Sequence, residues 1–285
     1  MPAPRIAIVT DSTSDIPASE ATRLGITVVP LNVHFGDEVL LDGVTVKGDE
    51  FYRRLQAGGA FPKTSQPSAG AFADAYRGVI AGGAEAILSI HISSKVSGTC
   101  NSANQAKAEL GGNVPIEVID TLQASMGLGL IAMEVARAAA AGLTASDAAS
   151  LARQLMGSTR FFGMVETLEY LQRGGRIGRA QMLLGSLLKV HPILTMQDGV
   201  AHPLERPRTR TRALDRMRAI AEGAIPLRAL SVLYSTQRQD GEALASQLKA
   251  AAPAQGITVA QFGPVLGTYL GPGAVGVALI QATPS

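Results

Sequence analysis

Residues 86–110 read AILSIHISSKVSGTCNSANQAKAEL and give the clearest indication of the architecture. The apolar start of this stretch favours a buried strand over 86–92, and its end favours a helix over 101–110. A loop rich in serine and threonine lies between them. A strand without apolar–polar alternation is typical of a parallel sheet that helices cover on both faces. The stretch therefore predicts a strand–loop–helix unit of an α/β protein.

The remainder of the first half repeats this alternation of strands and helices. Strands are expected at 5–10, 26–35 and 116–120, and helices at 17–25, 49–56, 69–81, 123–141 and from about 144 onward. Short apolar runs between helical segments belong to βαβ units, whose strands are parallel. The first half therefore predicts a mostly parallel sheet with helices on both faces.

The second half alternates less regularly. Strands are expected at 160–165, 193–196, 200–204, 229–234, 257–262 and after the glycine-rich turn 271–276, and helices at 211–223 and 241–251. This mixture predicts a C-terminal mixed α/β sandwich. We place the domain boundary near residue 158. An N-terminal α/β domain, 1–158, then carries the hydroxyl-rich loops, and a C-terminal α/β domain, 159–285, packs against it.

The composition argues against several classes of function. The chain has 285 residues, 25 basic and 23 acidic, so its net charge of +2 gives no reason to expect nucleic acid or membrane binding. Aromatic residues are only 4%, which supplies few stacking platforms for single-stranded nucleic acid. No apolar stretch reaches the ~20 residues of a membrane span. The lone Cys100 excludes an intrachain disulfide, and we expect a cytoplasmic protein without stable membrane insertion.

Two hydroxyl-rich segments precede predicted helices. The first is Lys63-Thr64-Ser65-Gln66-Pro67-Ser68, and the second is residues 91–99 of the stretch quoted above. A helix N-terminus leaves backbone N–H groups unpaired and carries partial positive charge. Hydroxyl side chains at such a place either cap the helix or help to bind an anion. Two such ends together would hold one small anionic head group, with ordinary capping as the alternative.

A serine hydrolase is a second interpretation of residues 91–99. His91 lies two residues from Ser93 at the end of a strand, so alternation places both side chains on one face. Such a pair, or His91 with Ser97, would act on a lipid ester. Against this interpretation, the chain lacks the G-x-S-x-G elbow of the α/β hydrolases.

Two further motifs have structural explanations, and two other kinds of motif are absent from the sequence. Residues 127–132 match the dinucleotide fingerprint G-x-G-x-x-A, but the first glycine comes seven residues after Asp120, the end of the preceding predicted strand, so close helix packing is the better interpretation. The loop 11–15, Asp-Ser-Thr-Ser-Asp, is expected to cap the next helix through Ser14 or Asp15, or to form part of a pocket wall. The chain has no Gly-Lys-Ser/Thr triplet, so it shows no phosphate-binding loop for ATP. Neither is there spacing typical of a metal site.

Two arginine groups leave their role open. One surrounds Gly174-Gly175, where a helix is expected to stop and a new one to start. The other consists of six arginines between residues 206 and 218. This second group is either a solvated face or a docking surface for an acidic partner or phosphate.

Six segments together resemble the DegV family of bacterial fatty-acid-binding proteins. They are residues 9–15, 63–68, 92–99, 168–178, 203–212 and 271–276, which span nearly the whole chain in family order. The resemblance implies a two-domain α/β protein in which the C-terminal domain closes a site for a long-chain fatty acid such as palmitate. It implies no cofactor.

The resemblance also assigns roles to individual residues. Ser65 and Ser97 would bind the fatty acid carboxylate directly, with Thr64 and Ser94 beside them. Tyr269 stands where family members commonly carry a histidine near the carboxylate.

Family members act as the binding subunit of fatty acid kinase, in which a separate ATP-binding subunit phosphorylates the bound lipid. The resemblance therefore implies that partner, and a role for Arg173, Arg176 and Arg208 in docking it or near the phosphoryl site.

Overall fold

A computed structural model describes residues 5–112, 114–184 and 190–282 of the chain. Its first half is built on a four-stranded parallel sheet with the order β2-β1-β6-β7. The strands are β1 (Ile6–Asp11), β2 (Ile26–Val29), β6 (Ala86–His91) and β7 (Ile116–Asp120). All six residues of β6 are buried, in line with the unbroken apolar pattern of the opening stretch.

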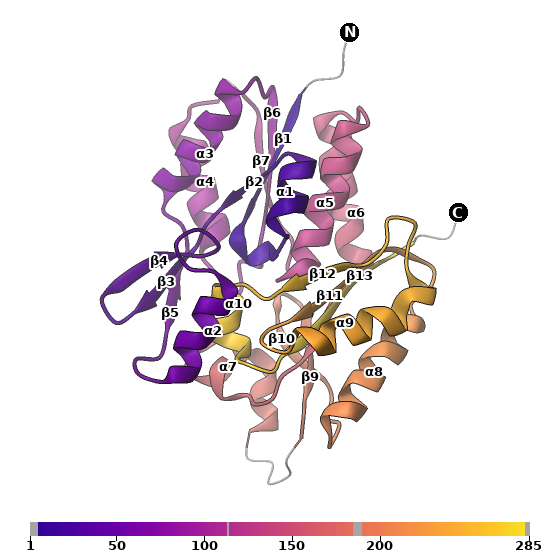
Figure 1. Cartoon of the computed structure of the whole chain (residues 1–285). Helices are drawn as coiled ribbons and strands as arrows, with labels where there is room; N and C mark the ends of the chain where they lie inside the picture. Colours follow the sequence, from indigo (N-terminus) through magenta and orange to yellow (C-terminus); the bar gives the residue numbers. More distant parts are fainter. Residues whose placement is uncertain (1–4, 113, 185–189, 283–285) are drawn as a thin grey trace.

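Helices cover both faces of this sheet, as predicted (Figure 1). One face is covered by α3 (Ala69–Ala81) and α4 (Thr99–Glu109). The other face is covered by α1 (Ala18–Leu24), α5 (Met126–Ala140) and α6 (Ala145–Ser158). The carboxyl ends of β1 and β6 lie at the same edge of the sheet. The loops that follow them, including the short 3-10 helix η1 (Ser12–Ser14), therefore meet there.

A small antiparallel sheet, β4-β3-β5, extends from this edge and was not predicted. It consists of β3 (Asn32–Phe35), β4 (Glu38–Leu41) and β5 (Lys63–Ser65), with α2 (Gly48–Ala57) between β4 and β5 in the chain. The single strand expected at 26–35 is wrong. Pro30 separates β2 from β3, because proline cannot donate to a sheet ladder and the chain leaves the parallel sheet at this point.

The second half forms a six-stranded mixed sheet with the order β10-β9-β8-β13-β11-β12. Its strands are β8 (Thr159–Met164), β9 (Ile193–Gln197), β10 (Val200–Glu205), β11 (Leu227–Tyr234), β12 (Thr258–Gln261) and β13 (Val275–Gln281). Only β11 and β12 pair in parallel. The outer face is covered by α8 (Arg210–Glu222), α9 (Arg238–Gln247) and η3 (Leu248–Ala251). This is the mixed α/β sandwich that the sequence predicts.

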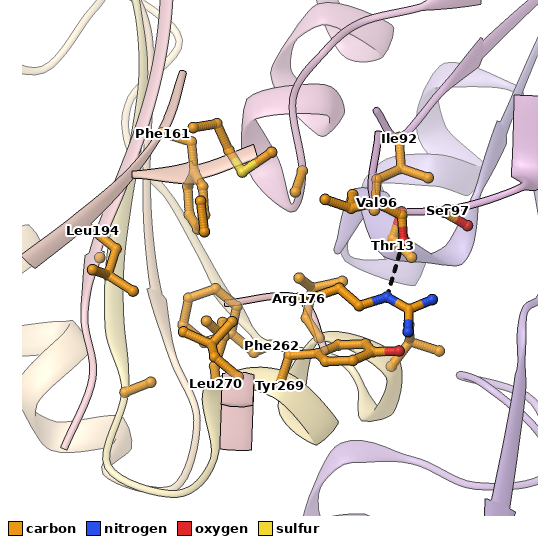
Figure 2. Close-up of a pocket in the computed structure, with 18 of the residues that line it drawn as sticks. Thr13, Ile92, Val96, Ser97, Phe161, Arg176, Leu194, Phe262, Tyr269 and Leu270 are labelled. Carbon is orange, nitrogen blue, oxygen red and sulfur yellow. Dashed lines mark hydrogen bonds between the residues drawn. The ribbon is translucent and has the colours of Figure 1, made fainter. Parts of the chain in front are cut away.

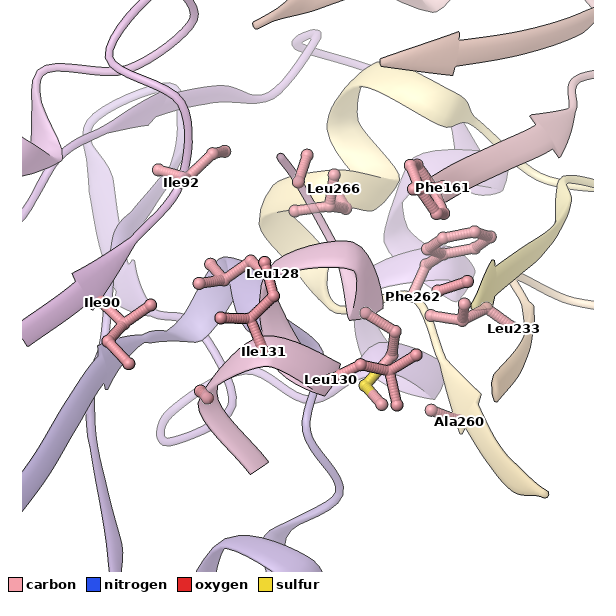
Figure 3. Close-up of a cluster of buried hydrophobic side chains, with 14 of the residues drawn as sticks. Ile90, Ile92, Leu128, Leu130, Ile131, Phe161, Leu233, Ala260, Phe262 and Leu266 are labelled. Atoms are coloured by element: carbon pink, nitrogen blue, oxygen red, sulfur yellow. The ribbon is translucent and has the colours of Figure 1, made fainter. Parts of the chain in front are cut away.

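Helix α5 lies between the two large sheets and contacts strands of both. One hydrophobic core runs through it, from Ile90 of β6 past Leu128 and Leu130 to Phe262 (Figure 3). A Cβ at Gly129 would lie 2.5 Å from the Ser14 carbonyl oxygen, so close helix packing explains the glycines of the fingerprint-like motif. The domain boundary near residue 158 stays a prediction.

Three short elements complete the face where the two halves meet. They are α7 (Glu169–Arg173), η2 (Gly178–Leu183) and α10 (Pro264–Leu270). Gly174 and Gly175 end α7, as predicted, with Gly175 at φ +70°. Helix α10 was not predicted, although Gly263 before it and Pro264 in its first turn are typical helix starts. Within the described ranges, no helix combines the length and apolar character that crossing a bilayer requires.

Candidate functional site

A cavity lies between the two halves of the molecule. The space within it, counted out to the solvent at its opening, is about 970 Å³. Its lining comes from the loops after β1 and β6 and from β5 on one side. On the other side it comes from β8, β9, α10 and the start of β13. The cavity is therefore formed only when both halves pack together.

Most of the cavity wall is apolar. Figure 2 shows Phe161, Leu194, Phe262 and Leu270 on the side of the six-stranded sheet and Ile92 and Val96 on the side of the parallel sheet. Further apolar lining residues are Leu31, Met164, Val165, Leu171, Met196, Val265, Leu266 and Val275. Such a wall contacts a hydrocarbon chain favourably and offers it no hydrogen bonds.

Hydroxyl groups gather at one end of the cavity, beside β5. The hydroxyl oxygens of Thr64 and Tyr269 are 2.5 Å apart. Ser65, the next residue of β5, accepts a hydrogen bond from Asn32 Nδ2 at 3.1 Å, and its oxygen lies 2.9 Å from His34 Nε2. Thr64, Ser65 and Tyr269 all line the cavity. Three of the five predicted lipid-binding residues thus meet beside β5, and Ser97 is a fourth that lines the cavity.

Ser97 reaches the same end from the loop before α4. Its hydroxyl oxygen is 2.8 Å from that of Thr99, and Gln66 lies against the adjacent Gly98. Ser94, the remaining predicted residue, does not line the cavity. It is exposed, and its backbone N–H donates to Asp120.

Arg176 also lies at this end, and it is the one charged side chain among the described lining residues. Its Nε donates to the Val96 carbonyl oxygen at 3.2 Å, and its guanidinium lies 5.4 Å from the centre of the Tyr269 ring (Figure 2). Gly174 makes this arrangement possible, because a Cβ there would lie 2.5 Å from the Tyr269 ring. The family resemblance gave Arg176 a role in partner docking or near the phosphoryl site, and it did not place this residue among the lipid-binding side chains.

The first hydroxyl-rich segment precedes a helix, as predicted, and the hydroxyl of Ser68 caps it, which is the capping alternative. Thr64 and Ser65 of this segment belong to β5 and not to the helix start. The second segment also precedes a helix, because α4 begins at Thr99 with no side-chain cap. The polar end therefore combines one strand and one helix start.

The serine hydrolase interpretation finds no support in the geometry. His91 is fully buried, and its Nδ1 and Nε2 contact Asp11 (2.8 Å) and Ser89 (2.6 Å). The hydroxyl of Ser93 donates to the Gly199 carbonyl oxygen at 2.7 Å. Neither Ser93 nor Ser97 pairs with His91. Ser89 does pair with it, but both residues are fully buried and neither lines the cavity, so this pair has no access to a substrate there.

Asp11 instead joins the two loops at the sheet edge. Its carboxylate accepts from Thr13 and from the Ile92 N–H, in addition to His91. Thr13 lines the cavity, so this loop forms part of its wall. The predicted capping of α1 by Ser14 or Asp15 is wrong, because Pro17 precedes α1 without a side-chain cap.

Two buried carboxyl groups hold the start of α10. Asp15 accepts hydrogen bonds from the Ser125 hydroxyl at 2.5 Å and from the Gly263 N–H at 2.9 Å. Asp42 accepts from the Ser12 hydroxyl at 2.8 Å. Burial raises the pKa of Asp15 to about 8 and that of Asp42 to about 7. These groups position the helix that carries Tyr269.

The two other predicted docking residues lie outside the cavity. Arg173 pairs with Glu169 at 3.1 Å and stacks on Phe61, 4.1 Å from the ring centre. Arg208 lies in a separate surface hollow with Glu205, Arg212 and other charged residues. Of the six arginines at 206–218, Arg210 is the most constrained. It pairs with both Glu166 and Asp240.

The arrangement is suited to binding an amphiphilic molecule. An apolar cavity with hydroxyls and one cation at one end matches an amphiphile with an acidic head group. Among the described residues, no three acidic, histidine or cysteine side chains form a metal-binding group.

Comparison with known proteins agrees with this architecture. The model of the DegV family, described as "Uncharacterised protein, DegV family", matches residues 5–282. A DegV domain-containing protein of Streptomyces coelicolor is 38% identical over 276 residues, which cover 95% of this chain and 97% of that protein.

Solved structures give the same result. A fatty-acid-binding DegV family protein from Thermus thermophilus is 34% identical, with a TM-score of 0.89 and coverage of 98% of this chain and 100% of that one. A stearic acid-binding protein from Eubacterium ventriosum is 30% identical, with a TM-score of 0.89 and coverage of 97% and 98%. Because the family model and the relatives span almost the whole chain, the protein belongs to the DegV family.

Proposed function

We propose that the protein binds one long-chain fatty acid in the cavity, with the carboxylate at the polar end. The observation that carries this proposal is the division of the lining into an apolar wall and one cluster of hydroxyls with Arg176. Each buried methylene contributes roughly 0.8 kcal/mol, so a long chain supplies most of the affinity. The carboxylate needs only a few donors, but it does need them, because an unpaired buried charge is costly.

The relatives support the same ligand class. The Thermus thermophilus and Eubacterium ventriosum proteins bind fatty acids, and so does DegV of Bacillus subtilis, which is 30% identical with a TM-score of 0.87. These proteins match this chain over at least 97% of its length, so the cavity-forming segments fall within the match.

Ser65 and Ser97 donate to the carboxylate in this proposal, with Thr64 and Tyr269 beside them. Asn32 already donates to the Ser65 oxygen. When His34 Nε2 is protonated, it also donates to the Ser65 oxygen, and the Ser65 hydroxyl can then donate its own hydrogen to the ligand. The expected tautomer of His34 is therefore the one with Nε2–H.

Arg176 supplies the positive charge at this end. Its Nε donates to the Val96 carbonyl oxygen, and its Nη1 donates to the Gly174 carbonyl oxygen at 3.0 Å. Arginine has five N–H donors, so donors remain for a carboxylate oxygen.

The proposal extends to a kinase partner. The chain presents its lipid to a separate ATP-binding subunit that phosphorylates the carboxylate to an acyl phosphate. The sequence supports this in part, because it contains no Gly-Lys-Ser/Thr triplet for ATP. The exposed residues Arg173 and Arg208 would dock that subunit.

Extraction of the purified protein with organic solvent, followed by mass spectrometry, tests the ligand. We expect about one fatty acid per chain, or stoichiometric uptake of added palmitate after delipidation. A protein that carries no acyl species and takes up neither palmitate nor oleate would contradict the proposal.

A further inference from the structure

The loop that joins α2 to β5, residues 58–62, has the sequence Gly-Gly-Ala-Phe-Pro. None of its residues has a polar side chain. Within the described ranges, no backbone hydrogen bond outside the helices and strands involves this loop either. Phe61 is its largest side chain and is half-buried. The packing of the Phe61 ring is therefore the main contact that can hold the loop in place.

The ring of Phe61 contacts the other half of the molecule. Its centre lies 4.1 Å from the guanidinium carbon of Arg173 and 6.0 Å from the centre of the Tyr170 ring, and both of these residues belong to α7. The loop and α7 accordingly lie side by side (Figure 1). Cation–π contacts and aromatic pairs are both favourable at such distances. Phe61 therefore ties the loop before β5 to α7.

This contact lies next to the polar end of the cavity in the chain on both sides. On one side, the loop leads directly into β5, an edge strand of three residues that supplies Thr64 and Ser65. On the other side, Leu171, the neighbour of Tyr170 in α7, lines the cavity. The contact between the Thr64 and Tyr269 hydroxyls joins the same two halves. Phe61 thus holds the halves together beside the place proposed for the carboxylate.

The other end of the loop has the backbone of a hinge. Gly58 and Gly59 have φ values of +81° and +106°, in the region that favours glycine. Gly58 directly follows the last residue of α2, so rotation at these two residues moves the loop and leaves the helix intact. A segment with a flexible glycine pair at one end and a single aromatic anchor at the other opens when the anchor is released.

We propose that residues 58–62 form a latch beside the polar end of the cavity, which Phe61 closes on α7 and whose release lets the fatty acid head group enter and leave. The inference rests on the proposed fatty acid site for its ligand. It also gives Arg173, one of the proposed docking residues, a second effect. An acidic group of a partner that binds Arg173 would draw the cation away from the Phe61 ring and loosen the latch next to the carboxylate.

The test compares Phe61→Leu with the matched control Phe35→Leu. Phe35 has the same two kinds of contact, with Arg54 at 5.7 Å and with Phe51 at 5.8 Å, and it does not line the cavity. Gly59→Ala is a second variant of the latch. A Cβ at this position meets nothing within 4 Å, so the substitution strains the closed loop through its positive φ and removes no contact.

Three measurements are made on the wild type and the three variants. Entry is followed by stopped-flow mixing of delipidated protein with trans-parinaric acid, a straight fluorescent fatty acid. Exit is followed by displacement of the bound probe with excess palmitate. Hydrogen–deuterium exchange of the backbone amides of residues 63–66 is measured by mass spectrometry on the delipidated proteins.

Entry and exit pass through the same open state, so Phe61→Leu should accelerate both by about fivefold and leave the Kd nearly unchanged. Gly59→Ala should accelerate both rates as well, whereas Phe35→Leu should keep the rates of the wild type. Amide exchange over 63–66 should be faster in the two latch variants only. Unchanged rates in both latch variants, or a loss of affinity without faster entry, would overturn the inference.

The amide exchange separates a failure of the latch from a failure of the proposed fatty acid site. If none of the four proteins binds the probe or palmitate, the proposed fatty acid site is wrong. Faster amide exchange over 63–66 in Phe61→Leu and Gly59→Ala, but not in Phe35→Leu, would then still support the latch. Equal amide exchange in all four proteins would overturn it.

Discussion

Replacing Tyr269 by phenylalanine removes one oxygen from the polar end of the cavity and leaves the ring in place. That oxygen lies 2.5 Å from the Thr64 hydroxyl, so each hydroxyl fixes the direction of the other. The ring should stay positioned, because it packs beside Arg176 and against Gly174. The variant therefore tests the hydroxyl and not the packing.

The loss of one hydrogen bond weakens the binding free energy of palmitate by about 1 kcal/mol, so its Kd should rise roughly fivefold. Competition with a fluorescent fatty acid on delipidated protein measures this change. Thr64→Val should give a similar loss. The double variant should lose less than the sum of the two single losses, by about 0.5 kcal/mol or more, because the two hydroxyls contact each other.

Tyr52→Phe is the matched control. Its hydroxyl donates to the Phe262 carbonyl oxygen at 3.1 Å, and Tyr52 does not line the cavity. This variant should lower the free energy of unfolding by about 1–3 kcal/mol, since it leaves a buried carbonyl unpaired, and should barely change the palmitate Kd. If Tyr269→Phe binds palmitate as well as the wild type, or if the two losses are strictly additive, the assigned role of the Tyr269–Thr64 pair is wrong.

Three further predictions concern the two serines of the polar end, the buried Asp15, and two arginines outside the cavity. Ser65→Ala and Ser97→Ala should each weaken palmitate binding by about 1.5–3 kcal/mol with folding intact, measured by the same competition; unchanged affinity in both would reject them as ligands. Asp15, with its pKa raised to about 8, binds more protons in the folded than in the unfolded state between pH 3.8 and about 8. The free energy of unfolding should therefore fall as pH rises through this window. Denaturant titrations at pH 5 and pH 8 measure this fall, which should be smaller for Asp15→Asn than for the wild type. An equal fall in both proteins would contradict the assignment. Neutralising Arg173 and Arg208 should reduce acyl phosphate formation by a supplied kinase subunit without changing lipid content. If the protein loses lipid to the same extent as it loses turnover, these arginines support the structure of the protein and do not dock the partner.

The sequence predicts the parallel part of the fold well, because it depends on local pattern. The buried strand β6 and the alternation around it follow from apolar runs between helices. Parallel strands place their carboxyl ends at one edge, which explains why the loops after β1 and β6 both reach the cavity.

The remaining features of the site depend on contacts between distant segments. Thr64 and Tyr269 are 205 residues apart and meet only because β5 pairs with β3 and α10 packs beside them. No local pattern indicates that pairing, since β5 has only three residues. In the sequence, Arg176 follows Gly174-Gly175, which indicates only that a helix ends there. Its place in the cavity follows from a hydrogen bond to Val96, 80 residues away.

The crystal structure of the palmitate-loaded protein tests the central claim most directly. The account predicts one palmitate in the cavity, with its carboxylate about 3 Å from donors among Ser65, Ser97, Tyr269 and Arg176. The acyl chain should run between the parallel sheet and the side chains of the six-stranded sheet. A palmitate bound elsewhere, or one whose carboxylate points away from these donors toward the apolar wall, would contradict it.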